Sequence, residues 1–216
     1  MKLFLRPRLH RAGVLAFDLD GTLYHNPEYL KFQEESQIEQ LADYLHIPNQ
    51  AASSLVLQRK KLRKERQLPP TSLANIFKEI GVPDDLIIEW RKRKLRPHNW
   101  LAPDPLLYES LNALKKFYQL ALITNNPRVI AEESLDALGV ASLIATIIAL
   151  DDTGKSKPDP APFQFLLQSM NQSAENCIVI GDRYDIDIHP ALNEGMSGIL
   201  IDNVKEIYLL PKLLLP

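Results

Sequence analysis

The stretch VLAFDLDGTLYHNP, residues 14–27, decides the fold prediction for this chain. A continuous apolar run leads directly into Asp18 and Asp20, and Gly21 follows them. A strand that is apolar without alternation is typical of a parallel sheet covered on both faces. The two carboxylates would then stand where the strand ends, so the question is which other side chains the fold brings to the same edge.

Four further apolar runs have the same continuous character and predict further strands. Helical patterns lie between the later runs, at residues 127–139 and 159–170. Strands that alternate with helices predict right-handed crossovers and an α/β fold, a Rossmann-like parallel sheet in a three-layer core. The five predicted strands are residues 14–18, 120–124, 144–150, 177–182 and 198–202.

The interval between the first two strands breaks this rhythm, because it is about 100 residues long and carries helical patterns almost throughout. Asn26 and Pro27 are suited to be the N-cap and the first residue of its first helix. We therefore predict an all-helical cap, residues 25–99, inserted into an α/β core made of residues 1–24 and 100–216.

Composition excludes several other classes of protein. The chain has 216 residues and a formal net charge of −2, which disfavours a dedicated nucleic-acid binder. It has one cysteine, Cys177, which rules out an internal disulfide framework. No apolar stretch reaches membrane-spanning length, which argues against a membrane protein. Residues 1–13 lack the long apolar region of a signal peptide. We expect a cytoplasmic protein with no membrane or nucleic-acid partner.

The carboxyl ends of parallel strands meet at one edge of the sheet, and sites in such folds form there. Polar side chains follow each of the first four predicted strands. They are Asp18 and Asp20; then Thr124, Asn125 and Asn126; then Lys155 and Lys157; and then Asp182, Asp185 and Asp187.

This inventory fits a phosphoryl-transfer site. Gathered carboxylates repel one another unless a cation joins them. Mg²⁺ prefers oxygen ligands that include one or two carboxylates, with phosphate oxygens among the others. A lysine and a hydroxyl would hold the remaining phosphate oxygens, and a carboxylate could attack phosphorus to form an aspartyl-phosphate.

Four motifs carry a resemblance to a known family: DLDGTL (18–23), TNN (124–126), KPDP (157–160) and GDRYDID (181–187). In this order, each at a predicted strand end, they resemble the motifs of the haloacid dehalogenase (HAD) superfamily. The helical insertion after the first motif is similar to the type 1 cap of subfamily I. The aspartate at position 20 implies phosphate chemistry, because dehalogenating members need no acid there.

The resemblance also implies a role for each matching residue. Asp18 would be the nucleophile and a Mg²⁺ ligand, and Asp20 the general acid/base, with its backbone carbonyl on the metal. Thr124 and Asn125 would bind the phosphoryl group. Lys157 would neutralise its charge and orient Asp18. Asp182 would be a metal ligand, supported by Asp187.

Some residues compete for one role. For the lysine that binds the phosphoryl group, Lys157 is preferred to Lys155, because Pro-Asp-Pro follows it. For the second acid of the last motif, spacing favours Asp187 over Asp185. The basic runs at 59–66 and 91–96 are interpreted as solvated helix faces, with contact to an anionic substrate as the alternative. Tyr24 and His25 could contact substrate. We interpret Trp90 and Trp100 as packing residues.

The predicted function is a Mg²⁺-dependent phosphatase that hydrolyses a small phosphate monoester through an aspartyl-phosphate intermediate. A phosphomutase with the same site and a non-catalytic binding protein of the same fold are the alternatives. Phosphoglycolate, sugar phosphates and nucleotides all remain open as substrates, and the sequence does not indicate an oligomeric state.

Overall fold

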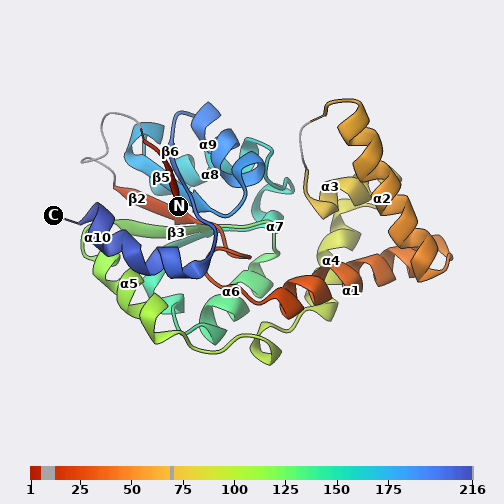
Figure 1. Ribbon diagram of the computed structural model, residues 1–216, viewed down its shortest axis with the longest axis horizontal. Helices are drawn as coiled ribbons and strands as arrows, with labels where there is room; N and C mark the ends of the chain where they lie inside the picture. The colour runs from red at the N-terminus through yellow and green to blue at the C-terminus, as the bar shows by residue number, and fades with distance from the viewer. Residues whose placement is uncertain (6–12, 69–70, 216) are drawn as a thin grey trace.

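The computed structural model describes residues 1–5, 13–68 and 71–215. Figure 1 shows an α/β core with a group of helices standing to one side of it. Residues 6–12 lie outside the described residues. They are part of the amino-terminal segment that, by its sequence, lacks the apolar region of a signal peptide. None of the described helices is both long and apolar enough to cross a membrane.

A six-stranded sheet in the order β1-β6-β5-β2-β3-β4 forms the centre of the core. All neighbours are parallel except β1, which is antiparallel to β6. The predicted α/β fold with an inserted helical cap is therefore confirmed. The strands are β1 (Lys2–Phe4), β2 (Val14–Phe17), β3 (Gln119–Ile123), β4 (Thr146–Ile148), β5 (Cys177–Gly181) and β6 (Ser197–Leu200).

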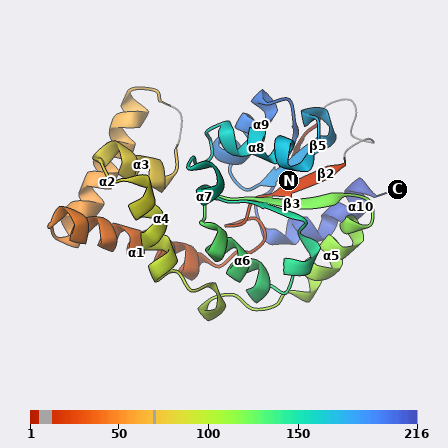
Figure 2. The same cartoon turned by 180° about the vertical axis from the view of Figure 1, so that it is seen from behind.

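The residues of β2 explain why both faces of the sheet are covered. Leu15 and Phe17 belong to one buried cluster, which includes side chains of α5, α6 and α10. Val14 and Ala16 belong to a second cluster, which includes side chains of α8 and α9. Figures 1 and 2 show these two groups of helices on opposite faces of the sheet. The core helices are α5 (Pro105–Lys115), α6 (Arg128–Ala137), α7 (Leu150–Thr153), α8 (Ala161–Met170), α9 (His189–Asn193) and α10 (Leu210–Leu214).

The cap consists of helices from the long interval between β2 and β3. Asn26 caps the first of them by accepting a hydrogen bond from the backbone of Tyr29 at 3.0 Å, as the sequence predicts. The cap helices enclose an apolar cluster of their own, which includes Leu41, Phe77 and Trp90. They are α1 (Pro27–Leu45), α2 (Asn49–Glu65), α3 (Leu73–Ile80) and α4 (Asp84–Lys94).

Short helical turns complete the chain. A π-helical turn, Tyr184–Ile188, follows β5 and carries Asp187 into the site described below. The 3₁₀ turns are Pro97–Asn99, Ala141–Leu143, Ala174–Asn176 and Val204–Leu209.

Apart from shifts of one or two residues at the other strand ends, the structure differs from the predicted strands in two ways. The sequence pattern does not predict β1, a short antiparallel edge strand whose Leu3 is exposed. The strand predicted at 144–150 is shorter, because its last residues serve the next helix. Ala149 is the N-cap of α7, and its backbone N–H donates to the carboxylate of Asp152 at 2.7 Å.

Candidate active site

β2 lies between β3 and β5. From β2 the chain adds β3 and β4 on one side, and it then crosses back to add β5 and β6 on the other side. Phe17 is paired in register with Leu122 of β3 and with Ile180 of β5. The residues that follow these strands therefore emerge side by side at one edge. This is the switch point at which open parallel sheets form their sites.

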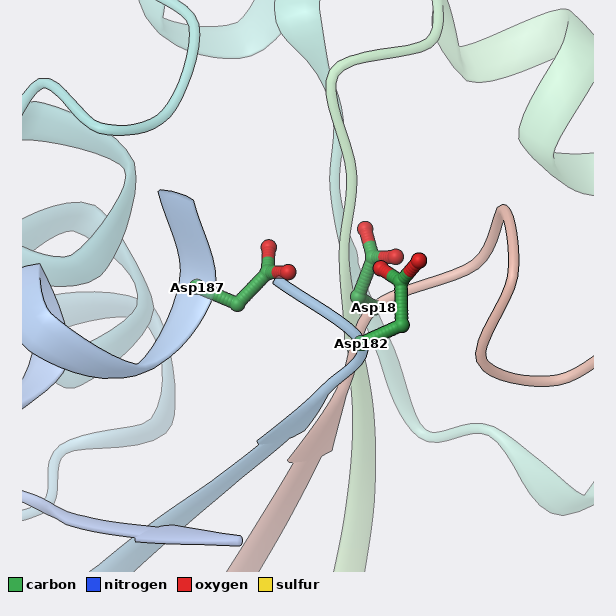
Figure 3. A group of neighbouring side chains, drawn as sticks. All are labelled: Asp18, Asp182 and Asp187. Atoms are coloured by element: carbon green, nitrogen blue, oxygen red, sulfur yellow. The ribbon is translucent and has the colours of Figure 1, made fainter. Parts of the chain in front are cut away.

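Three aspartates converge at this edge. Asp18 follows β2, Asp182 follows β5, and Asp187 comes from the π-helical turn, as Figure 3 shows. One carboxylate oxygen from each lies within 4.8 Å of the other two. Asp18 and Asp187 are buried, whereas the side chain of Asp182 is 27% exposed. Three carboxylates this close need positive charge between them.

Lys157 supplies one such charge. Its ammonium Nζ donates to Asp18 Oδ1 at 2.7 Å and to Asp187 Oδ1 at 2.6 Å, and the side chain is fully buried. Burial disfavours the charged form, but Asp18 and Asp187 outweigh this effect and raise the pKa of Lys157. Lys157 is therefore a permanent cation at neutral pH. Lys155, its competitor in the sequence, is exposed.

Asn125 fixes the backbone that carries Lys157. Its side-chain Oδ1 accepts from the Lys157 backbone N–H at 2.7 Å, and its Nδ2 donates to the Lys157 carbonyl at 3.1 Å. Thr124 is buried beside it, and its hydroxyl accepts from the Asn126 backbone N–H at 3.2 Å. Because the hydroxyl is the acceptor there, its own hydrogen can be donated to a bound ligand.

Asp20 does not belong to this group of three aspartates, and three donors hold its carboxylate. The Tyr24 hydroxyl and Gln33 Nε2, the latter at 3.0 Å, donate to Oδ1. Asn126 Nδ2 donates to Oδ2 at 2.6 Å. Burial and the adjacent charge of Asp20 raise the pKa of Tyr24 well above its ordinary value, so Tyr24 stays a neutral donor. The orientation of Asp20 is therefore fixed by donors from three parts of the chain: Asn126 of the core, Gln33 of the cap and Tyr24 of the segment between them.

Asp182 has the features of a metal ligand. Its buried Oδ1 has no hydrogen-bond partner among the described residues. Burial, followed by the charges of Asp18 and Asp187, raises the pKa of Asp182 to about 7. Gly21 has a φ of +85°, and a Cβ there would lie 2.4 Å from Asp182 Oδ2, so the site requires a glycine.

These residues fit a hard divalent cation such as Mg²⁺. The cluster offers only carboxylate oxygens, and one of them, Asp182 Oδ1, accepts no hydrogen bond among the described residues. Its three potential negative charges face the buried ammonium of Lys157 and the half-exposed guanidinium of Arg183, which lies 3.7 Å from Asp182 Oδ1. Lys157 and the backbone N–H of Arg183 already occupy the two oxygens of Asp187. Both oxygens of Asp18 also accept hydrogen bonds, Oδ1 from Lys157 at 2.7 Å and Oδ2 from the Thr22 hydroxyl at 3.2 Å. Asp182 therefore has the most free capacity for a metal among the three aspartates.

The cap closes over this edge and leaves a cavity of about 340 Å³. On the core side the cavity is lined by Asp20, Asn125 and Asp182, and on the cap side by Gln33 and Arg91 among others. Arg91 is buried, and it donates to the Asn125 carbonyl at 2.6 Å and to Asn126 Oδ1 at 3.0 Å.

The sequence reasoning misses Gln33, and its preferred interpretation of the run 91–96 as a solvated face is wrong for the buried Arg91. The alternative, contact of this run with an anionic substrate, stays a prediction. Helical spacing carries a signal in each case. Arg91 lies four residues after Ile87, on the buried face of α4. Gln33 begins a buried polar stripe on α1 that continues through Gln37 and Gln40.

The remaining candidates lie outside the acidic cluster. Asp185 and His25 are exposed. Trp90 packs edge-on against Phe77 inside the cap, and Trp100 stacks on Tyr29 where the chain returns to the core, so both are packing residues as predicted.

Comparison with known proteins agrees with the geometry. The family model for haloacid dehalogenase-like hydrolases matches residues 13–195. The chain therefore belongs to the haloacid dehalogenase-like hydrolases. In fold it is similar to a HAD phosphatase from Thermococcus onnurineus, with a TM-score of 0.62 and 20% identity over 94% of this chain and 97% of that one.

Its relatives define the class further. The chain is 28% identical over 191 residues to the pyrophosphatase PpaX of Bacillus velezensis, covering 86% of this chain and 81% of the relative. It is 29% identical over 200 residues to a phosphoglycolate phosphatase of Colwellia psychrerythraea, covering 89% and 86%. The protein is a phosphatase of this superfamily.

Proposed function

We propose that the protein is a Mg²⁺-dependent phosphatase that transfers the phosphoryl group of a small phosphate monoester to Asp18 and then to water. The observation that carries this proposal is the buried position of Lys157 between Asp18 and Asp187, close to Asp182, whose Oδ1 accepts no hydrogen bond among the described residues. An attacking carboxylate, a fixed cation and an oxygen that can ligate a metal are the parts that phosphoryl transfer needs.

In the first step an oxygen of Asp18 attacks phosphorus while the ester P–O bond breaks. Asp20 acts as the general acid and passes a proton to the leaving oxygen. In the second step water attacks the phosphorus of the aspartyl-phosphate, gives its proton to Asp20, and the bond to Asp18 breaks. The enzyme returns to its starting state, and the products are inorganic phosphate and an alcohol.

The other residues act on charge and orientation. Lys157 neutralises charge on the phosphoryl oxygens and holds Asp18, and the Thr124 hydroxyl and the Asn125 amide bind the phosphoryl group. Asp18, Asp182 and the Asp20 backbone carbonyl would hold Mg²⁺, with Asp187 in support. When bound, the ion supplies positive charge opposite the transferring group.

The helices of residues 25–99 act in this proposal as a separate cap domain that excludes water and contacts the leaving group. Its hinges are the two linkers, residues 22–26 and 97–103. The Asn26 side chain donates to the Trp100 carbonyl at 2.8 Å, which ties the two linkers to each other. A cytoplasmic location remains a prediction.

The relatives act, by their names, on pyrophosphate and on phosphoglycolate. We infer a small phosphorylated metabolite as the substrate, and sugar phosphates and nucleotides belong on the same test panel.

The test is phosphate release from such a panel, with Mg²⁺ and with EDTA. We expect activity that EDTA abolishes and Mg²⁺ restores. Asp18→Asn should be inactive, and it should form no acid-stable phosphoenzyme from labelled substrate. Asp185→Asn is the matched control, because it makes the same substitution at an exposed aspartate of the π-helical turn beside the site. Wild-type protein that hydrolyses no member of the panel would favour the non-catalytic alternative, and an isomeric phosphate product would favour a mutase.

A further inference from the structure

Arg91 is a buried cation with no anionic partner among the described residues. The side chain is 7% exposed, and its three hydrogen bonds go to neutral acceptors. Burial lowers the pKa of Arg91, although the charge of Asp20 opposes this. Buried charges in proteins are normally paired, so an unpaired guanidinium at a cavity wall indicates a ligand that brings the negative charge.

The pattern of hydrogen bonds shows which part of the guanidinium is available. Nε donates to Gln37 Oε1 at 2.9 Å, and Nη1 donates to both the Asn125 carbonyl and Asn126 Oδ1. Arginine has five N–H groups, and two of them are on Nη2. No hydrogen bond from Nη2 is present within the described part of the chain, and Arg91 lines the cavity between cap and core.

The other charged groups around the cavity have partners. Both oxygens of Asp20 accept hydrogen bonds from neutral donors. Lys60 pairs with Glu34 at 3.0 Å, and both side chains are about half exposed. Arg183 lies 3.7 Å from Asp182 Oδ1. Among these cations, Arg91 is the deeply buried one, and no carboxylate of the described residues is in ion-pair contact with it.

The position of Arg91 decides which end of a substrate it can meet. It stands on the cap side of the cavity, and Asp20 and Asp182 stand on the core side. A phosphoryl group delivered to Asp18 lies at the core edge, so the leaving part of the substrate extends toward the cap. The volume of about 340 Å³ lies within the range of small-molecule sites.

We propose that Arg91 binds a second negatively charged group, located on the leaving part of the substrate. This proposal rests on the phosphatase function proposed above and narrows it. The substrate class is small phosphate esters or anhydrides whose leaving group carries a carboxylate or a phosphate. The fixed planar fork of an arginine suits either of these anions.

The test compares substrates that differ in this charge. Phosphoglycolate and 2-hydroxyethyl phosphate have leaving groups of similar size, one anionic and one neutral. Pyrophosphate and methyl phosphate form the second pair, which separates a phosphate from a carboxylate. In wild-type protein we expect kcat/KM to favour the anionic member of at least one pair by about 10- to 100-fold, as befits a charge-assisted contact.

Arg91→Gln should reduce this preference to within a few fold of unity by lowering kcat/KM for the anionic substrate selectively. Arg91→Lys should retain part of it. Lys94→Gln is the matched control, because it removes the same charge from an exposed position of the same helix. Its substrate preference should equal that of wild type.

Arg91 also supports Asn125 and Asn126, and this role predicts a different result. If Arg91→Gln lowers kcat/KM equally for the charged and the neutral substrate, Arg91 only positions those residues and the proposal is wrong. It is also wrong if wild-type protein turns over both members of each pair equally well, and in that case the phosphatase proposal still stands. If no phosphate compound is hydrolysed, the phosphatase proposal itself fails.

A binding measurement keeps the proposal testable without turnover. Calorimetry on Asp18→Asn should show tighter binding of phosphoglycolate than of 2-hydroxyethyl phosphate, or of pyrophosphate than of methyl phosphate. Adding Arg91→Gln should remove that difference. Binding that does not change on adding Arg91→Gln would overturn the proposal.

Discussion

Replacing Lys157 with methionine should destabilise the protein strongly while leaving the shape of the site largely intact. Methionine is close to lysine in length, but it offers no donor to Asp18 Oδ1 and Asp187 Oδ1, which now accept at 2.7 and 2.6 Å. Both carboxylates are buried, so the substitution leaves them without their shared cation. Removing one partner of a buried ion pair costs about 3–5 kcal/mol.

For a chain of this length, each kcal/mol lowers Tm by about 2–4 °C, so Lys157→Met should melt roughly 6–20 °C below wild type. Calorimetry in buffer with EDTA measures this difference. The loss should be smaller at pH 5 than at pH 8. Burial already raises the pKa of Asp187, and Lys157 opposes this shift. Without the lysine, Asp187 takes up a proton more readily at low pH, which removes part of the unpaired charge.

Lys155→Met is the matched control, because the same substitution two residues earlier falls on an exposed side chain. It should change stability by no more than about 0.5 kcal/mol. Equal melting temperatures for the two variants in the absence of metal would refute the reasoning, since they would mean that Asp18 and Asp187 do not depend on Lys157.

Three further results are expected. Gly21→Ala should weaken Mg²⁺ binding about tenfold or more in calorimetric titration, because its Cβ would collide with Asp182. Gly154→Ala, with a similarly positive φ but nothing within 4 Å, should bind Mg²⁺ normally, and equal loss in both would contradict this. Tyr24→Phe should lower kcat about 5- to 30-fold with little change in metal affinity, because Asp20 loses one donor; an unchanged kcat would count against that role. With the pKa of Asp182 at about 7, Mg²⁺ affinity should fall as pH decreases through 7. The metal-free protein should become less stable as pH rises from about 4 to 7, because the folded state then holds a proton that the unfolded state has released. Affinity and Tm that stay constant over this range would exclude the raised pKa.

Much of the core could be predicted because its signals are local. Continuous apolar runs identify strands buried on both faces, and the residue after each run is then placed at the sheet edge. This reasoning predicts that Asp18 and Asp182 emerge together, and the structure brings them together with Lys157 and Asp187. Their catalytic roles remain proposals.

The features that sequence reasoning misses depend on tertiary contacts. β1 has three residues, pairs with β6 at the edge of the sheet and is partly exposed. The pattern of apolar residues in this segment therefore does not differ from that of a loop. Arg91 stands at the start of a basic run whose other members at 93 and 94 are exposed. Only the docking of α4 against the core decides that this one arginine is buried.

The contacts that join α3, α4 and the segment before α3 to the core are polar. Ser72 and Ser156 share a hydrogen bond of 2.9 Å, Lys78 donates to the Gly154 carbonyl at 3.2 Å, and Lys92 lies 3.6 Å from Asp151. Water can replace each such bond at a net cost of only about 0.5–1.5 kcal/mol. The apolar cluster inside the cap would stay intact if these bonds opened. A bound molecule that adds one ionic contact between cap and core contributes a free energy of comparable size. Binding in the cavity therefore shifts the balance between the joined and the separated arrangement of cap and core.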